Sequence, residues 1–158
     1  PRAVFAGSPD NLALAGGLGC APVDLVDGPL GEEGVTFSHG YWSHARADAI
    51  MEGVRRQMEI CDFCPYLMMT HSGGDSGTDS GLACKVLEGL KSSRNKLLVW
   101  SLCCVASGEE ASAASKANSA LCMHHGLLEH TDFSAMVDKE SLLRAASAKV
   151  NGLGLVSP

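Results

Sequence analysis

The chain has 158 residues, the size of one ordinary domain. Its composition, 46% hydrophobic and 19% charged, excludes a disordered tail. The formal net charge of −6 provides no basic excess for phosphates, so we expect neither a nucleic-acid nor a membrane partner. No apolar run approaches the ~18 residues of a membrane span. The chain starts at Pro1 and a strand-like run follows at once, so we expect it to be part of a larger domain.

Helical and extended patterns alternate along the chain. Residues 7–36 are rich in glycine, proline and aspartate and have weak periodicity, which predicts mostly loop. Ser43 is a candidate N-cap, because apolar residues at helical spacing follow it and predict an amphipathic helix of about four turns. These are Ala47, Ile50, Met51, Val54 and Met58. Residues 65–71 suit a buried strand, residues 72–81 form a loop, and a second helix begins near Leu82.

The second half of the chain repeats this order. Residues 96–105 are predicted to form a buried strand and residues 113–128 a third helix. Residues 133–137 are predicted as a strand and residues 139–150 as the last helix. Because strands alternate with helices, we predict an α/β fold whose sheet is mainly parallel, with helices on both faces. Its neighbouring strands would be 66–70, 97–104 and 133–137.

The seven cysteines do not indicate a disulfide framework. Their number is odd, the chain is not small and no secretory signal is visible, so a reducing compartment fits better. Cys61 and Cys64 form a C-x-x-C pair, but a structural zinc site usually needs a second such pair. Cys103 and Cys104 are adjacent and would point to opposite faces of a strand. We therefore expect no metal site and interpret the cysteines as small buried hydrophobic residues.

The segment from Thr70 to Leu82, THSGGDSGTDSGL, is the most informative in the chain. It follows a buried strand and opens a helix, where main-chain N–H groups and the helix dipole favour an anion. Its glycines allow close approach to a phosphate, and its hydroxyls add donors. It is neither a Walker loop nor a GxGxxG motif. The pattern predicts a different phosphate loop or, alternatively, a flexible turn. His71 is interpreted as a structural hydrogen-bonding group.

A second interpretation of this loop is a hydrolase. Residues 74–77 read GDSG, which is identical to the nucleophile motif of chymotrypsin-like serine proteases. A catalytic triad also needs a histidine base and an aspartate, which those proteases hold in an all-β double barrel. This sequence predicts an α/β fold instead, so a serine hydrolase remains a distant alternative.

Five collinear segments resemble one protein family. They are Pro1–Phe5 (PRAVF), Phe37–Gly40 with Glu59–Asp62 (FSHG, EICD), Thr70–Ser72 with Gly77–Gly81 (THS, GTDSG), Asn118–Leu121 with His124 and Thr131–Asp132, and Val137–Leu142 (VDKESL). In order and rough spacing they are similar to tubulin over nearly the whole chain. The third segment, Thr70–Ser72 with Gly77–Gly81, resembles the tubulin signature THSxGGGTGSG. Trp100 and the turn at 108–109 are more similar to the delta and zeta tubulins.

This resemblance implies a single, incomplete, Rossmann-like GTP-binding domain over residues 1–158. It implies GTP or GDP as the ligand, with or without Mg²⁺. The implied nucleotide-binding residues are Gly34, Ser72, Gly74, Gly77, Thr78, Ser80 and Gly81. The implied partners are other tubulin subunits or microtubules, and the implied location is the cytoplasm and cytoskeleton, extending to the centriole or basal body for a delta- or zeta-like chain.

The chain also departs from the family pattern. Asp75 and Asp79 stand where the signature has glycines, and two carboxylates oppose phosphates unless Mg²⁺ intervenes. Ser115 replaces an expected acidic residue, and the family's first strand and its first phosphate loop have no counterpart here. We assign no catalytic residue, because an acidic residue of the next subunit completes hydrolysis in that family. The alternative function is a degenerate scaffold that does not bind nucleotide.

Overall fold

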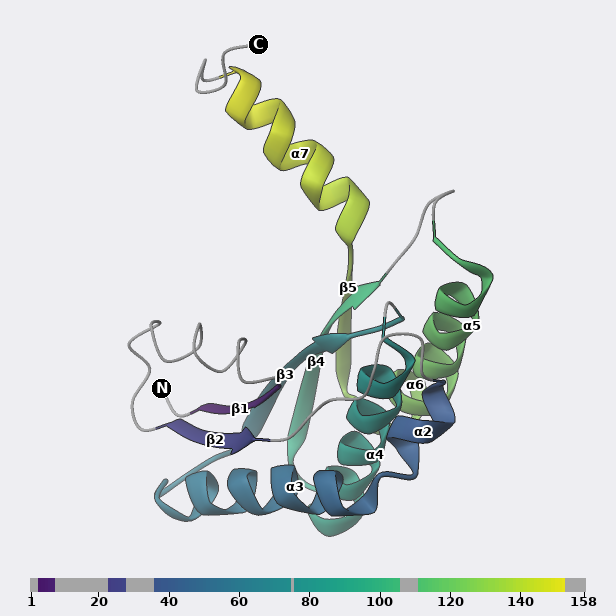
Figure 1. Cartoon of the computed structure of the whole chain (residues 1–158). Helices are drawn as coiled ribbons and strands as arrows, with labels where there is room; N and C mark the ends of the chain where they lie inside the picture. Colours follow the sequence, from purple (N-terminus) through teal and green to yellow (C-terminus); the bar gives the residue numbers. More distant parts are fainter. Residues whose placement is uncertain (1–2, 8–22, 28–35, 75, 106–110, 153–158) are drawn as a thin grey trace.

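A computed structural model describes residues 3–7, 23–27, 36–74, 76–105 and 111–152 (Figure 1). The strands are β1 (Ala3–Gly7), β2 (Val23–Asp27), β3 (Tyr66–Ser72), β4 (Leu98–Val105) and β5 (Phe133–Asp138). The helices are α2 (Phe37–Tyr41), α3 (His44–Glu59), α4 (Gly77–Ser93), α5 (Ala113–Leu121), the π-helical η1 (Cys122–Leu127), α6 (Leu128–His130) and α7 (Lys139–Gly152).

The strands form two parallel sheets. β1 pairs in parallel with β2. In the second sheet β4 lies between β3 and β5 and is parallel to both. The predicted α/β class, the parallel pairing and the adjacency of the three predicted strands are confirmed.

One strand lies in a segment that we expected to be mostly loop. That expectation is wrong at Val23–Asp27, which forms β2. Its sequence, VDLVD, mixes apolar residues with two aspartates, so it does not have the continuous apolar run of a buried strand. All five residues of β2 pair in parallel with β1, and this pairing defines the strand. Residues 8–22 and 28–35 lie outside the described residues.

The helices follow the predicted order with two differences. α4 begins at Gly77, so the loop predicted over 72–81 is shorter, because the Ser76 side chain caps the helix. The predicted helix 113–128 is continuous but becomes π-helical at Cys122–Leu127. Ser43 precedes α3 as predicted, although its side chain makes no capping hydrogen bond.

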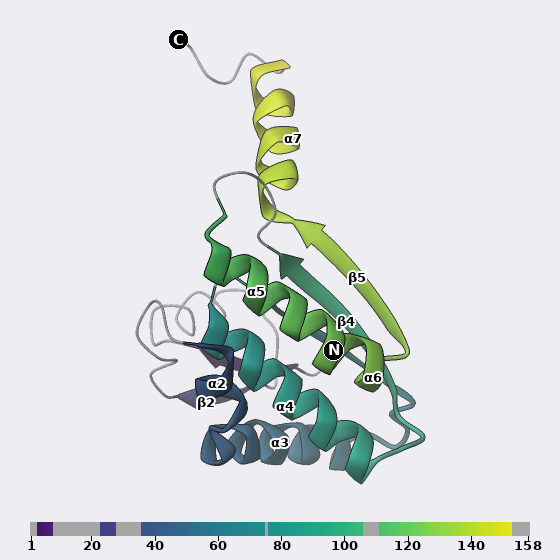
Figure 2. The same cartoon turned by 90° about the vertical axis from the view of Figure 1, so that its right-hand side faces the viewer.

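α4 is the central helix of the core. Its apolar residues Leu82, Val86, Leu87 and Leu90 are buried in one cluster with Val99 of β4. Figures 1 and 2 show α4 and α5 side by side along one face of the three-stranded sheet, while α7 extends from β5 away from the body. No helix in the described ranges combines the length and apolarity needed to cross a bilayer.

The opposite face of that sheet carries exposed aromatic side chains. Tyr66, Trp100 and Phe133 are 59%, 46% and 57% exposed. Their rings form a row, with centroid distances of 6.0 Å from Tyr66 to Trp100 and 5.8 Å from Trp100 to Phe133. The described helices therefore cover one face of the three-stranded sheet, and helices on its second face are not among the described residues.

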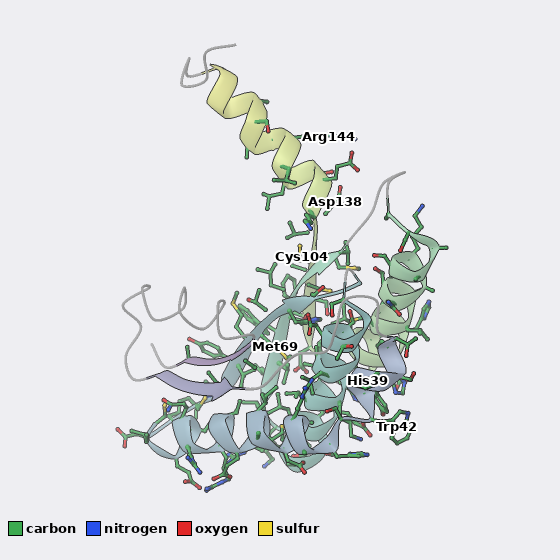
Figure 3. The ribbon with its side chains drawn as sticks, in the orientation of Figure 1. His39, Trp42, Met69, Cys104, Asp138 and Arg144 are labelled. Carbon is green, nitrogen blue, oxygen red and sulfur yellow. The ribbon has the colours of Figure 1, made fainter. Side chains whose placement is uncertain are left out.

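A cavity of about 680 Å³ separates β1 from β3. Its walls include Ala3 and Val4 of β1, Ile50 of α3 and Met69 of β3, which is labelled in Figure 3. β1 and β3 are not hydrogen-bonded neighbours, so the cavity lies between the facing edges of the two sheets. Asp79, in the first turn of α4, also lines it.

Candidate functional site

The candidate site is the short loop that joins β3 to α4. Its start is fixed to the neighbouring elements. The Gly73 amide donates to the carbonyl of Cys104, 2.7 Å away, at the end of β4, where Figure 3 labels Cys104. A Cβ on Gly74 would lie 1.9 Å from the Ser119 hydroxyl of α5. Glycine is thus required at position 74 for the loop to pack against α5.

The end of the loop forms a regular helix N-terminus. Ser76 is the N-cap, and its Oγ accepts the Asp79 amide at 3.2 Å. The first intrahelical bond runs from the Ser80 amide to the Ser76 carbonyl. Within the described residues, the amides of Gly77 and Thr78 have no acceptor. Two N–H donors at the positive end of a 17-residue helix are suited to an anion.

Thr78 adds a polar group for which the described part of the chain offers no partner. Its side chain is 1% exposed, and its hydroxyl has no hydrogen-bond partner among the described residues. Buried hydroxyls are almost always hydrogen-bonded in native proteins. A hydroxyl without a partner next to two free amides fits a ligand that carries acceptor oxygens, such as a phosphate.

Asp79 opposes this fit. It lines the cavity between β1 and β3, and its buried Oδ1 also has no partner among the described residues. A carboxylate oxygen accepts but does not donate, so it needs a donor or a cation rather than a phosphate oxygen. The residues of this loop therefore fit a phosphate through the main chain and Thr78, but not through Asp79.

The structure separates the predicted nucleotide-binding residues into three groups. Ser72, Gly74, Gly77 and Thr78 lie together along the loop and the first turn of α4. Ser80 and Gly81 are in that turn too, but both are used inside the protein. The Ser80 hydroxyl donates to the Ser76 carbonyl at 2.8 Å. Gly34 lies outside the described residues, as does Asp75.

Gly81 allows α2 to contact α4. A Cβ on Gly81 would lie 2.0 Å from the Phe37 carbonyl oxygen, and a Cβ on Gly40 would lie 1.8 Å from that of Thr78. The backbones of α2 and α4 therefore touch at two glycines. The signature-like motif predicts Gly81 as a binding residue because Gly81 ends that motif, whereas the contact with α2 has no signal in the local sequence.

His71 is a structural hydrogen-bonding group, as the sequence analysis proposed. One ring nitrogen, Nδ1, lies 2.9 Å from the Ser72 carbonyl, and Nε2 lies 2.8 Å from the Ser101 hydroxyl. A carbonyl oxygen only accepts, so Nδ1 carries a proton. Burial lowers the pKa of His71, although the hydrogen bond to Ser72 partly offsets this. The ring is therefore neutral near pH 7, with the Nε2 lone pair accepting from Ser101.

The arrangement does not support a serine hydrolase. Ser76, the serine of the GDSG motif, uses its Oγ to cap α4, and His71 bonds Ser101 rather than Ser76. The fold is a parallel α/β fold and not a double β-barrel. The Ser115 amide donates to the Ser112 hydroxyl, which caps α5, while the buried Ser115 hydroxyl has no partner among the described residues.

Comparisons with known proteins agree with this fold and loop. The model of the Tubulin/FtsZ family, GTPase domain, matches residues 30–147. The chain is 28% identical over 108 residues to "Tubulin alpha-1B chain" of Physarum polycephalum and 32% identical over 108 residues to "Tubulin alpha-1B chain" of Schizophyllum commune. It is 25% identical over 123 residues to "Tubulin alpha-1 chain" of Emericella nidulans.

These alignments cover 67–77% of this chain but only 24–27% of the relatives. The chain thus spans about a quarter of the length of the curated relatives that it matches. All three relatives are alpha chains, so they give the expected delta- or zeta-like subtype no support. The family match covers most of the chain and includes the whole β3–α4 junction. This chain belongs to the Tubulin/FtsZ family and corresponds to part of its GTPase domain.

Proposed function

We propose that this chain is the part of a tubulin-like, GTP-binding cytoskeletal protein that contacts the nucleotide phosphates. The observation that supports the proposal best is the β3–α4 junction, where the amides of Gly77 and Thr78 and the Thr78 hydroxyl have no hydrogen-bond partner among the described residues. GTP or GDP would bind there with its phosphates at the N-terminus of α4. Ser72 and Gly74 would form the side of the loop that faces the ligand.

The proposed partners are other tubulin subunits or microtubules, and the proposed location is the cytoplasmic cytoskeleton. Membership of the family and the named alpha-tubulin relatives support both. They do not support a centriole or a basal body.

Asp79 favours a second candidate function, a scaffold that keeps the fold without the nucleotide. Its carboxylate occupies the first turn of α4 beside the cavity, and one carboxylate oxygen has no partner among the residues that the structure describes. A negative charge there repels phosphate, so a degenerate domain would retain it at no cost.

The experiment that separates the two is a titration with a fluorescent GTP analogue, competed with unlabelled GTP. Saturable, competed binding supports the GTP-binding protein, and its absence up to millimolar GTP supports the scaffold. Thr78→Val then tests the site. One hydrogen bond to a charged acceptor contributes about 1.5 kcal/mol or more, so the variant should bind GTP roughly tenfold more weakly.

The matched control is Ser80→Ala, two residues further along α4. The Ser80 hydroxyl bonds the Ser76 carbonyl, so its removal should change the stability of the chain and leave GTP affinity unchanged. Thr78→Val should do the reverse, because it removes a hydroxyl that has no partner in the described protein. GTP affinity that falls for Ser80→Ala and not for Thr78→Val would contradict the proposed contact.

A further inference from the structure

Beneath the β3–α4 loop, a histidine and two cysteines from three elements meet, and a third cysteine from a fourth element lies against one of them. His71 is the penultimate residue of β3, Cys84 is in α4, Cys103 is in β4 and Cys122 begins η1. The Sγ atoms of Cys84 and Cys122 are 3.7 Å apart. A ring nitrogen of His71 and the Sγ atoms of Cys103 and Cys122 all lie within 4.8 Å of one another. The three thiols are at most 1% exposed.

The spacing of these atoms fits a tetrahedral metal centre. Zn²⁺ binds thiolates at about 2.3 Å, so two thiolates on one tetrahedral ion lie about 3.8 Å apart. Cys84 and Cys122 are already at that separation. Cys122 lies next to both other thiols. Cys84 lies outside the trio of His71, Cys103 and Cys122, whose ligand atoms are all within 4.8 Å of one another, so its side chain has to turn toward the ion to become the fourth ligand.

His71 is held in the form that a metal ligand needs. Its Nδ1–H donates to the Ser72 carbonyl, which fixes the ring and leaves the lone pair on Nε2. A main-chain carbonyl in this position is a common second partner of metal-binding histidines. The Ser101 hydroxyl now donates to Nε2, and a cation bound there would take its place.

Two glycines leave room for the sulfur atoms. A Cβ on Gly73 would lie 2.3 Å from the Cys103 Sγ, and a Cβ on Gly126 would lie 2.4 Å from the Cys84 Sγ. Gly73 belongs to the loop and Gly126 to the π-helical turn, so the backbone closes over the cluster from both sides. The three buried cysteines of the described residues are thus Cys84, Cys103 and Cys122, while the other described cysteines are only partly buried.

We propose that His71, Cys84, Cys103 and Cys122 bind one Zn²⁺ ion as a structural Cys₃His site. The ion ties the end of β3 to β4, α4 and η1, directly under the proposed phosphate loop. Soft thiolate ligands together with one imidazole select Zn²⁺ over Mg²⁺ or Ca²⁺. This proposal does not depend on nucleotide binding, since none of its four ligands is among the proposed GTP contacts.

The test is metal binding by the chain in a variant that keeps only the cluster cysteines, Cys20→Ser/Cys61→Ser/Cys64→Ser/Cys104→Ser. Co²⁺ serves as the spectroscopic probe, because thiolate ligands give it charge-transfer bands and a tetrahedral site gives strong visible bands. We expect one Co²⁺ per chain, displaced by one Zn²⁺, and a higher Tm with Zn²⁺. No charge-transfer band, or a Cys84–Cys122 disulfide in the chain isolated under reducing conditions, would overturn the proposal.

Ligand variants complete the test. Cys122→Ala should weaken Co²⁺ binding about 100-fold or more, because even the partners of metal ligands contribute about 10- to 100-fold. Ser101→Ala is the matched control: it removes a hydroxyl that only competes for Nε2, so Co²⁺ should bind equally well or more tightly. Far-UV circular dichroism establishes that each variant is folded, and His71→Gln replaces Cys122→Ala if that variant is not. Co²⁺ affinity that is unchanged in the folded ligand variant would refute the site.

Discussion

Gly40 of α2 lies directly against Thr78 of α4, so that a Cβ on Gly40 would be 1.8 Å from the Thr78 carbonyl oxygen. This contact joins a five-residue helix to the turn that carries the proposed phosphate contacts. Any displacement of α2 would therefore move Thr78. A side-chain hydrogen bond strengthens the contact, since the Tyr41 hydroxyl of α2 donates to Glu88 of α4.

The first prediction is that Gly40→Ala destabilises the chain. The added methyl group cannot fit without shifting a backbone, and overpacking of this kind costs about 1–3 kcal/mol. Urea unfolding measures the loss. Gly89→Ala, also in a helix, is the control: its Cβ would be 3.3 Å from the flexible end of Met51, so it should be neutral or stabilising by about 0.5–1 kcal/mol. Equal losses for both variants would argue against the tight α2–α4 contact.

The second prediction concerns the ionisation of Tyr41. Burial and the hydrogen bond from its hydroxyl to Glu88, 2.7 Å long, raise the pKa of Tyr41 to about 12. The pKa of a tyrosine in the unfolded chain is about 10. The contribution of neutral, hydrogen-bonded Tyr41 to the free energy of unfolding is therefore fully present below pH 10 and is lost as pH rises from about 10 to 12.

Ultraviolet absorbance measures this titration directly in Tyr66→Phe, which leaves Tyr41 as the single tyrosine. Glu88→Gln in that background should lower the pKa of Tyr41 but keep it above 10, because burial remains. A Tyr41 pKa near 10 before the Glu88 change would show that the bond is not formed in solution.

The third prediction is that Asp132 stabilises the start of β4 and β5. Its Oδ2 accepts the Val99 amide at 2.7 Å and pairs with Lys91, while its own amide donates to the Val99 carbonyl. Asp132→Ala should cost about 1 kcal/mol, a value kept low because the carboxyl is 37% exposed. Lys91→Met should cost less, since Asp132 keeps its bond from Val99.

The effect of Asp132 should depend on pH. The ion pair with Lys91 and the Val99 amide hold the pKa of Asp132 below its usual value. A lowered pKa gives stability that is present above the unfolded value of about 3.9 and lost as pH falls through the folded value. Unfolding free energies of the parent and Asp132→Ala should therefore converge in acid. A difference that persists at the lowest pH where the chain folds would mean that the carboxylate charge is not its cause.

Local sequence patterns were sufficient to predict most of the architecture. The helical spacing of Ala47 to Met58 predicts α3, and the apolar run at 96–105 predicts β4. The expectation that β4 is a buried strand is wrong for one of its faces, where Leu98 and Trp100 are exposed, because the described helices cover the other face only. The β3–α4 loop could also be predicted from local sequence, because its glycines and hydroxyl residues follow one another in the chain. β2 was missed, because it depends on its partner strand more than on its own residues.

Features that depend on tertiary contacts could not be predicted. The proposed Cys₃His site takes single residues from four elements, so no spacing in the sequence predicts it. The C-x-x-C pair, which spacing did single out, does not form a cluster: Cys61 donates to Gln57 and Cys64 to Tyr66. Ser80 and Gly81 were assigned to the ligand because their neighbours in the motif were, whereas an intrahelical bond and the contact with α2 use them.

The last prediction is that Asp75→Gly/Asp79→Gly increases GTP affinity. A unit charge about 6 Å from a phosphate interacts with it by roughly 3 kcal/mol at an effective dielectric constant of 20, and solvent and salt reduce this to about 1 kcal/mol per carboxylate. Removal of both should tighten binding about tenfold to a hundredfold. The same variant should be less stable without nucleotide. The negative charge of Asp79 interacts favourably with the helix dipole in the first turn of α4, and glycine lowers the stability of a helix.

Tighter binding combined with lower stability distinguishes local repulsion from a general change in the fold. GTP titration and urea unfolding measure the two quantities, and Asp62→Gly, which removes an exposed carboxylate between α3 and β3, is the control and should leave GTP affinity unchanged. Titration with and without Mg²⁺ decides the role of the metal. If the carboxylates hold Mg²⁺ against the phosphates, the double variant binds more weakly when Mg²⁺ is present, because the ion then bridges Asp79 to the nucleotide. That result would replace repulsion with a metal-assisted phosphate site, and it would explain the unpartnered Asp79 oxygen in the cavity as a ligand position.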